Sequence, residues 1–552
     1  MKNAIKLLSV LVALIAAVPA FAWIGTADLG TYDPLDELAP YNQTGVRTLS
    51  PDTLYTIYGL YYVESGATIN IPAGTVIQGV PGATLVVKPG GQIFATGEVN
   101  RPIVMTSSEL PGNRFPGDWG GVVILGRAPV NQVNPLIEGG IIEGSYGGND
   151  AQDNSGVFKY VRIEYPGYRF QLNNEINGLT LGGVGRGTEI HHVQVSYSFD
   201  DSYECFGGTV DMHHLVALGG TDDDFDTDFG YQGRLQFLFS LRDPNNWDTA
   251  GQSNGFESDN DGSGSSAQPY TFPVYSNVTL VGPEAVQLPL PAGNTFENAG
   301  VLRRNCRTSV FNSVIAGFPR GMSIRDGSRA AAGTDTLRFE NNEVTGSYLY
   351  STNNIHDTGR WPMVGTWFMG HANMDSVPRL ASVVGLGDLS DLTNPNPVPQ
   401  AGSVLIGTAD WSDSYLADPY FTQVSYRGAF DPALSMDQQW TAGWTNFDCQ
   451  ATDYAALTPV TGEVPAQLAS AVNFPNPFNP STTIRFTVPA RGQVSLKIYD
   501  VRGREVTTLQ DGVLEANTYS IQFNGEGLSS GTYFYRVKGQ GFDLTRKMQL
   551  VK

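Results

Sequence analysis

Carboxylate side chains recur at alternate positions in three short stretches between residues 200 and 261. The pair Tyr203-Glu204 recurs as Phe225-Asp226 after 22 residues (225 − 203), and as Phe256-Glu257 after a further 31 (256 − 225). Oxygen ligands of this kind, gathered in loops, are those that calcium prefers in proteins. The candidate calcium ligands are Asp200, Asp201, Glu204, Asp224, Asp226, Asp228, Glu257, Asp259 and Asp261.

The element that must position these acids is itself repetitive. His191-His192 recurs as His213-His214 at the same spacing of 22 residues (213 − 191), among short β-prone runs separated by Gly and Asp. This period is too short for a propeller blade and the runs are too poor in helix formers for a helical solenoid, so it predicts coils of a parallel β-helix. Stacked strands lie ~4.8 Å apart, and residues in register therefore form columns along the solenoid.

A column of acids needs water or a cation. Two carboxylates ~5 Å apart repel by about 3 kcal/mol at an effective dielectric constant near 20. The acid runs are not EF-hands, because Leu235 and Gln268 stand where the twelfth ligand is needed, so any site would draw ligands from adjacent coils. The alternative to calcium is a solvated ladder of acidic turns.

The paired histidines offer a second kind of ligand. Strict alternation places His191 and His213 on the inner side, with Val193, and directs His192 and His214 outward. Two outward histidines with a nearby acid could hold zinc, although stacked polar residues are the commoner arrangement.

Glycan cleavage is the enzymatic alternative, because pectate lyases and polygalacturonases are β-helix enzymes whose active sites lie on an acidic face of the solenoid. Asp200-Asp201 is similar to the paired acids of polygalacturonases, but the Gly-His-Gly and Arg-Ile-Lys elements of that family are absent. A calcium-dependent lyase would need a base beside the acids, and the candidates are Arg162, Arg186, Arg234 and Lys159. Fold analogy alone is a weak warrant, so catalysis stays open and we favour a binding role.

Charge and composition narrow the partners. The 552 residues carry a net charge of −21, which argues against nucleic acid and anionic membranes as partners. The 64 glycines and 33 prolines indicate an all-β, turn-rich protein. The three cysteines (Cys205, Cys306 and Cys449) form no disulfide framework, and a Cys306–Cys449 bridge is left open.

The chain divides into five segments. Residues 1–22 have the basic start, apolar run and Ala20-Phe21-Ala22 site of a signal peptide, and no segment is apolar enough to span a bilayer. An irregular lead-in follows at 23–57, and the β-helix is expected over 58–351 with roughly ten coils, a rod about 48 Å long. Residues 352–464 are rich in Trp and are expected to cap the open end of the helix; a sugar-stacking face is the alternative. Residues 465–552 alternate as short strands of a β-sandwich.

The tail carries specific motifs from residue 473 onward, and it resembles the type A sorting domain of the type IX secretion system, an Ig-like domain. The motifs are Phe474-Pro-Asn-Pro-Phe-Asn-Pro, Ile498-Tyr-Asp-Val-Arg-Gly-Arg-Glu-Val, Leu528-Ser-Ser-Gly-Thr-Tyr-Phe-Tyr-Arg-Val and Lys547-Met-Gln-Leu-Val-Lys. The resemblance implies that the type IX machinery is a partner. It also implies export through the periplasm and across the outer membrane, with release or attachment to surface lipopolysaccharide.

The body resembles an uncharacterised group of secreted β-helix proteins. The carrying residues are Asp118-Trp-Gly-Gly-Val-Val-Ile-Leu-Gly, Ser202-Tyr-Glu-Cys-Phe-Gly-Gly, Asp223-Asp-Phe-Asp-Thr-Asp, Tyr426-Arg-Gly-Ala-Phe and Trp440-Thr-Ala-Gly-Trp-Thr. Together these observations predict an all-β protein, a right-handed parallel β-helix followed by an Ig-like β-sandwich. We expect it to be stabilised by calcium and to bind polysaccharide or another surface outside the cell.

Overall fold

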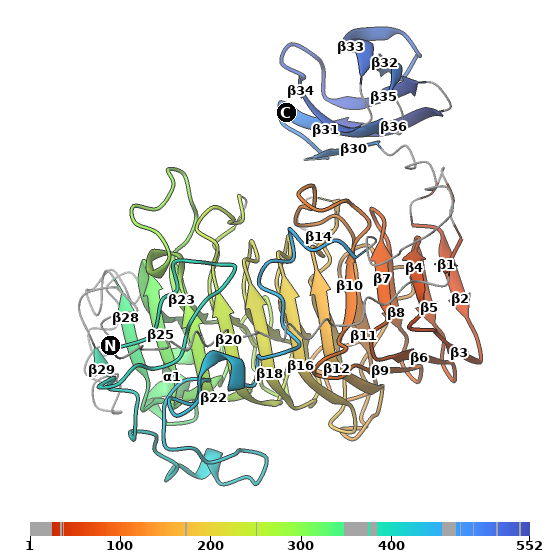
Figure 1. Ribbon diagram of the computed structural model, residues 1–552. Coiled ribbons are helices and arrows are strands. Elements are labelled where there is room, and N and C mark those ends of the chain that lie inside the picture. Colours follow the sequence, from red (N-terminus) through yellow and green to blue (C-terminus); the bar gives the residue numbers. More distant parts are fainter. Residues whose placement is uncertain are drawn as a thin grey trace, which may run out of the picture.

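Consecutive turns of the chain stack as parallel strands in this computed structural model (Figure 1). The structure describes residues 25–31, 33, 36, 38–171, 174–249, 251–346, 374–375, 384–454, 471–474, 476–488, 491–514, 517–539 and 542–551. One face of the solenoid is a ten-stranded sheet with one strand per coil, which confirms the right-handed parallel β-helix of about ten coils. Its strands are β2 (Pro40–Gln43), β5 (Leu60–Val63), β8 (Thr84–Val87), β11 (Gly121–Leu125), β15 (Leu179–Gly182), β17 (Tyr203–Phe206), β19 (Phe225–Asp228), β21 (Phe256–Ser258), β23 (Asn298–Leu302) and β26 (Arg320–Ile324).

The rest of the solenoid wall is a sheet of 17 strands, called the long sheet below. Its first coils contribute two short strands each: β1 (Gly25–Leu29), β3 (Val46–Thr48), β4 (Thr53–Ile57), β6 (Thr68–Pro72), β7 (Val76–Gly79), β9 (Gln92–Thr96) and β10 (Ile103–Ser107). Both series pair with one long strand, and four more long strands follow: β12 (Gly156–Glu164), β16 (Glu189–Ser196), β18 (Met212–Leu218), β20 (Arg234–Leu241) and β22 (Val274–Val281). The last coils divide again into β24 (Ser309–Phe311), β25 (Val314–Phe318), β27 (Phe339–Glu340), β28 (Glu343–Gly346) and β29 (Met374–Asp375).

Four other elements and one hairpin lie in the connections between strands or in the segment that follows the solenoid. They are the helix α1 (Asp326–Gly333), the 3-10 turns η1 (Pro283–Ala285), η2 (Ser414–Leu416) and η3 (Met436–Gln438), and the hairpin of β13 (Arg169–Gln171) with β14 (Asn174–Glu175).

The solenoid is longer than the sequence predicted. Strands β1 and β2 already pair with β4 and β5, so the expected lead-in over 23–57 belongs to the first coils from Gly25 onward. At the other end β28 pairs with β29, beyond the predicted limit at residue 351. Both ends were missed because their strands are short and mostly polar on the outer face. The predicted signal peptide, residues 1–22, lies outside the described residues.

Each long strand bends at one residue of positive φ. These residues are Tyr160, His192, His214, Phe237 and Asn277, with φ between 48° and 60°. The strand pairings skip them on both sides. A residue in the left-handed region interrupts the alternation of inner and outer side chains, and two consecutive side chains then face outward. We call this column of bend residues the bend ladder.

The bend ladder corrects the predicted orientation of the histidines. Ile190 and Val193 are buried in the solenoid core, while His191 and His192 between them are both half-buried on the outer face. The same holds for His213 and His214. His191 and His213 therefore do not point inward, because strict alternation fails at the following residue.

A segment of the expected Trp-rich cap covers the side of the solenoid. Residues 384–454, called the strap, pack Phe430 and Trp444 against Phe239 and other buried residues of the long sheet. Outward-facing amides of the sheet bind the strap backbone: Gln194 donates to the carbonyl of Asn446 (2.7 Å) and Gln236 to that of Thr422 (2.7 Å). The side chain of Arg114, in an early coil, reaches the carbonyl of Cys449 (2.7 Å). The strap thus runs back along the solenoid, whereas residues 352–373 and 376–383 lie outside the described residues.

The tail forms two antiparallel sheets over a single buried core. They comprise β30 (Ala471–Phe474), β31 (Ser481–Val488) and β34 (Asn517–Asn524) in one, and β33 (Glu505–Leu514), β32 (Gly492–Asp500), β35 (Gly531–Gly539) and β36 (Phe542–Leu550) in the other. On β32 the buried Val494, Leu496 and Ile498 alternate with more exposed residues, as the sequence predicted for a β-sandwich.

The strap should depend on its buried tryptophan. Replacing Trp444 with Ala removes a fully buried indole whose Nε1 donates to the carbonyl of Trp440 (2.7 Å), and we expect a loss of about 3–5 kcal/mol of unfolding free energy. Chemical unfolding followed by circular dichroism measures this loss, and proteolysis should cut the strap faster. Val404→Ala, at a site 38% exposed on the same strap, should change stability by less than about 0.5 kcal/mol; equal effects of the two changes would contradict the packing described.

Candidate metal site on the ten-stranded sheet

Acids from three successive coils lie in one file on the outside of the ten-stranded sheet. Strands β17, β19 and β21 pair in register, so that Glu204 lies beside Asp226 and Asp226 beside Glu257. The residues before them, Tyr203 and Phe225, stack in the core with ring centroids 5.3 Å apart. Alternation along a strand therefore turns the acids outward, and the predicted register is confirmed.

The turns that precede two of these strands add two more pairs of acids. Asp200 and Asp201 precede β17, and Asp222 and Asp223 occupy the equivalent positions before β19. Oδ1 of Asp201 accepts a hydrogen bond from the backbone N–H of Asp223 (2.8 Å), which ties the two turns together.

These seven acids form overlapping groups that we call the acidic column. Potential ligand atoms lie within 4.8 Å of one another in each of three sets: Asp200, Asp201 and Asp222; Asp201, Glu204 and Asp226; Asp223, Asp226 and Glu257. Asp201 and Asp226 each belong to two sets, so the file is continuous along the solenoid. Oxygen atoms at these separations could be drawn onto a common cation.

Among the described residues, an ion pair forms at only one end of the acidic column. Glu257 pairs with Arg303, whereas none of the ion pairs among the described residues joins the other six acids to a base. Burial raises the pKa of Asp201 and of Asp226 well above the usual range, and neighbouring carboxylates add to the effect. The same causes raise the pKa of Glu204. A folded chain that keeps these groups ionised therefore lacks a compensating charge.

Four of the nine predicted ligands are held elsewhere. Asp224 is fully buried against Arg242 (3.0 Å) and the hydroxyl of Ser240. Asp259 pairs with Arg303 and Arg304. Asp228 accepts from the backbone N–H of Phe229 (2.6 Å), and Asp261 accepts from the backbone N–H and the hydroxyl of Ser263. The structure therefore places Asp200, Asp201, Glu204, Asp226 and Glu257 in the overlapping groups of the column, whereas Asp224, Asp228, Asp259 and Asp261 lie outside those groups.

Sequence reasoning left other members of the site out. Asp222 and Asp223 could have been chosen, because they lie 22 residues after Asp200 and Asp201. Asn177 is buried and its Nδ2 donates to Glu138 (3.0 Å) and to Glu204, while its Oδ1 has no hydrogen-bond partner among the described residues. Glu138 comes from a connection outside the repeat, so no spacing in the sequence points to it.

The four bases considered for a lyase do not flank the acidic column. Arg162 pairs with Glu164, Lys159 with Glu189, and both Arg186 and Arg234 with Asp211. The described bases near the column are Arg169 at the Asp200 end, Arg242 near Asp223, Arg303 at the Glu257 end and, beyond it, Arg325. The strand register explains why Arg325 lies beyond the end of the column. Glu257 pairs in register with Val301, and Val301 with Ser323, whose Oγ accepts a hydrogen bond from Nε of Arg325 (2.8 Å).

All three cysteines are buried and free, so Cys306 and Cys449 form no bridge. The thiol of Cys306 instead lies 3.3 Å from the Ser328 hydroxyl, and that of Cys449 lies 3.1 Å from the hydroxyl of Tyr165. Cys205 occupies a core position in register with Thr227, as expected for a small stacked residue.

Fold and site define a parallel β-helix with an acidic outer file, and comparison with known families agrees with this class. Residues 41–364 match the pectate-lyase-like β-helix domain, and the chain belongs to this family. Residues 473–551 match the secretion system C-terminal sorting domain, so the chain is a cargo of the type IX secretion system that is exported to the cell surface or beyond. No curated protein matches the chain. Over the described part of the chain, no helix is long and apolar enough to cross a membrane.

The acidic column should make stability depend on pH in an unusual direction. A carboxyl group whose folded pKa is raised favours the fold below its unfolded pKa, near 4, and this contribution is lost as pH rises toward the folded pKa. In the presence of a chelator we therefore expect the melting temperature to fall as pH rises from about 4 through neutrality.

Scanning calorimetry across pH measures this fall, and an Asp201→Asn/Asp226→Asn variant should flatten it. Asn keeps an oxygen to accept the backbone N–H bonds of Asp223 and Thr227. A wild-type profile that is flat or rises over the same range would contradict the assignment.

Proposed function

We propose that this protein is an exported β-helix whose acidic column binds calcium and, through calcium, anionic groups of a polysaccharide or of surface lipopolysaccharide. The observation that carries the proposal is the set of six carboxylates (Asp200, Asp201, Glu204, Asp222, Asp223 and Asp226) that form no ion pair with a described base. At ~4.8 Å and an effective dielectric constant near 20, each neighbouring pair repels by about 3 kcal/mol.

Calcium suits this arrangement better than magnesium does. Calcium accepts six to eight oxygen ligands at 2.3–2.6 Å in a flexible geometry, whereas magnesium demands a near-ideal octahedron. The column offers carboxylates from adjacent coils at unequal depths: Asp201 and Glu204 are buried, while Asp222 and Asp226 are half-buried. The buried Oδ1 of Asn177 adds a neutral oxygen beside Glu204.

A glycan ligand is supported by the surroundings and by the family. The half-buried acids leave one side of a bound ion open to an anionic sugar. Beside Asp200 lie the half-buried ring of Phe199 and the guanidinium of Arg169, which is 4.7 Å from that ring's centroid. Aromatic rings and guanidinium groups both bind sugars well. The matching family takes its name from pectate lyases, which act on an acidic polysaccharide.

If the acidic column binds calcium, calcium should raise the melting temperature, and this increase should depend on the acids of the column. Calcium at 100 times its dissociation constant stabilises the fold by about 2.7 kcal/mol, so we expect an increase of several degrees in melting temperature relative to chelator. The double variant Asp201→Asn/Asp226→Asn should lose this increase.

The matched control is Asp261→Asn, because this acid belongs to the same run of sequence but is held in its own serine turn. It should keep the calcium response. Identical melting curves of the wild type with calcium and with chelator would overturn the proposal.

A calcium-dependent polysaccharide lyase is the second candidate, and Arg325 favours it. Burial and the nearby charge of Arg303 lower the pKa of Arg325, as a guanidinium acting as base would require. By contrast, despite burial, Glu257 and Asp259 raise the pKa of Arg303, which keeps that guanidinium charged.

Retention and cleavage separate the two candidates. A binding protein should be retained on immobilised acidic polysaccharide in calcium and released by chelator, with no rise in absorbance from unsaturated sugar. A lyase should produce that rise, and Arg325→Gln should abolish it while the calcium melting shift remains. Neither retention nor cleavage across a panel of acidic polysaccharides would contradict both roles for the column.

A further inference from the structure

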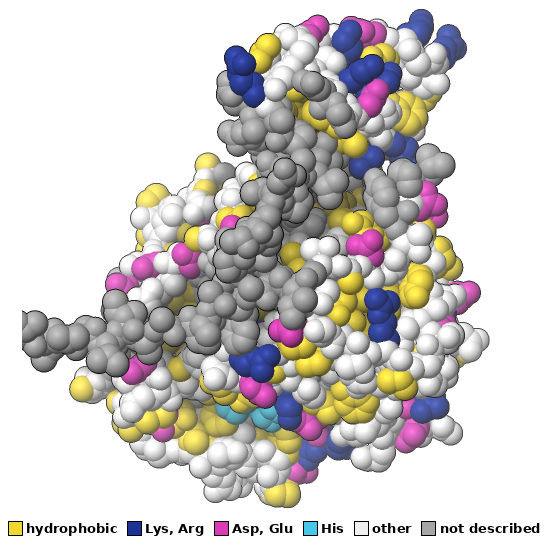
Figure 2. Space-filling view, turned by 45° about the vertical axis from the view of Figure 1, so that its right-hand side comes forward, with side chains coloured by type: hydrophobic (Ala, Val, Ile, Leu, Met, Phe, Trp, Pro, Cys, Tyr) yellow, Lys and Arg dark blue, Asp and Glu magenta, His cyan; other side chains and the backbone are white. Residues whose placement is uncertain are grey.

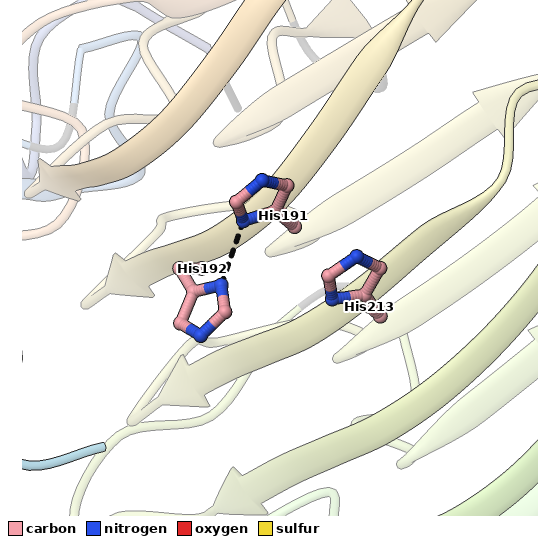
Figure 3. A group of neighbouring side chains, drawn as sticks. All are labelled: His191, His192 and His213. Atoms are coloured by element: carbon pink, nitrogen blue, oxygen red, sulfur yellow. Dashed lines mark hydrogen bonds between the residues drawn. The ribbon is translucent and has the colours of Figure 1, made fainter. Parts of the chain in front are cut away.

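Four histidines form a compact group on the opposite wall of the solenoid from the acidic column. His191 and His192 lie on β16, and His213 and His214 lie one coil further on β18. Figure 3 shows the first three of these side chains. The positive φ of His192 and His214 turns both members of each pair outward. The described part of the chain contains no other histidine.

The ring nitrogens converge within and between the pairs. Nδ1 of His191 lies 2.7 Å from Nδ1 of His192, and the corresponding distance for His213 and His214 is 2.6 Å. The rings also stack from coil to coil, with centroids 4.7 Å apart for His191 and His213 and 4.4 Å apart for His192 and His214. Ring nitrogens of His191, His192 and His213 lie within 4.8 Å of one another.

A carboxylate fixes the tautomer at one corner of the group. Nε2 of His191 lies 3.1 Å from Glu189, which also pairs with Lys159 (2.9 Å). The charged carboxylate accepts the Nε2–H, so the lone pair of His191 is on Nδ1, aimed at His192. A histidine held in this way by a carboxylate is the usual arrangement around a protein-bound metal.

Aromatic side chains enclose the group on its other sides. The ring of Tyr160 lies 4.4 Å from that of His192, Phe237 lies 5.0 Å from His214, and Trp440 of the strap lies 5.1 Å from His214. Burial lowers the pKa of His192 to about 3, of His213 to about 4 and of His214 to about 2. The rings are therefore neutral at neutral pH, the form in which imidazole binds metals.

We propose that the histidine group is a second metal site, which binds one zinc-like transition-metal dication through Nδ1 atoms of His191, His192 and His213, with His214 as the fourth donor. Zinc–nitrogen bonds of 2.0–2.1 Å place tetrahedral ligands about 3.4 Å apart. The Nδ1 atoms within each histidine pair are closer together than this, and the ring centroids of histidines on adjacent coils are further apart. Modest rotations of the rings would therefore bring the nitrogens to the tetrahedral spacing.

The site is reachable and chemically distinct from the acidic column. Figure 2 shows histidine side chains at the molecular surface, between hydrophobic and charged neighbours, and the side chain of His191 is 16% exposed. Imidazole nitrogens suit zinc, copper and nickel, whereas calcium takes oxygen ligands. The two sites should therefore be filled by different ions.

Neighbouring coils supply variants that should fold normally. Gln236 occupies the register position after His213, and Phe237 follows His214 in the bend ladder. His213→Gln/His214→Phe therefore removes two donors while copying an adjacent coil. The full chain, freed of metal, is titrated with Zn²⁺ by calorimetry, and bound Cu²⁺ is examined by electron paramagnetic resonance.

We expect about one Zn²⁺ per chain, an increase of several degrees in melting temperature, and nitrogen hyperfine coupling to Cu²⁺. The double histidine variant should melt normally without metal, lose the coupling, and bind zinc at least tenfold more weakly. The Asp201→Asn/Asp226→Asn variant should keep the zinc response while losing the calcium response, so either site can fail alone.

Two outcomes would overturn the proposal. One is a wild-type chain that binds no zinc or shows copper with oxygen ligands only, which would leave the rings as an N–H···N hydrogen-bonded ladder. The other is a double histidine variant with unchanged zinc affinity and copper spectrum.

Discussion

Parallel register is the constraint on which the whole molecule depends. Each coil places its residues directly beside those of the next, about 4.8 Å away. A residue type that recurs at one register position therefore contacts its own kind on the neighbouring coils. Apolar residues gain from this arrangement: Tyr203, Phe225 and Phe256 stack into one core that runs from Leu29 to Val344. Charged residues of one sign are destabilised by this arrangement, because the register holds like charges about 4.8 Å apart, where they repel each other.

The chain resolves that conflict differently at different positions. Asp224 is neutralised inside the wall by Arg242, and Glu257 at the surface by Arg303. At Lys159 and Glu189 opposite charges come from adjacent coils. The other six acids of the acidic column form no ion pair with a described base. Because the molecule has arginines available in the same coils and places them elsewhere, the uncompensated stretch is a specific feature of the surface and not a general shortage of cations.

The sequence predicted well what depends on the repeat and poorly what interrupts it. The register of Glu204, Asp226 and Glu257 follows from spacing alone, as does the β-helix itself. The orientation of His191 could not be obtained in this way, because one left-handed residue at His192 adds an outward position without changing the period. Glu138 and the strap were missed for a related reason: both are brought to the solenoid by connections whose path no local pattern encodes.

The strap explains why the two polar files differ in character. It lies over the long sheet, where Trp444 packs against His192 and Trp440 against His214, so that both histidines are half-buried. Burial then favours neutral nitrogen donors, since a neutral imidazole loses far less hydration than a carboxylate does. On the ten-stranded sheet Asp222 and Asp226 are half-buried to the same degree as these histidines, and Asp201, Glu204 and Asp223 are buried, so charge in the acidic column needs a cation or bound protons to offset it. One register thus produces a file of nitrogen donors packed against aromatic rings and a file of buried and half-buried carboxylates, and the two files differ in the ions that suit them.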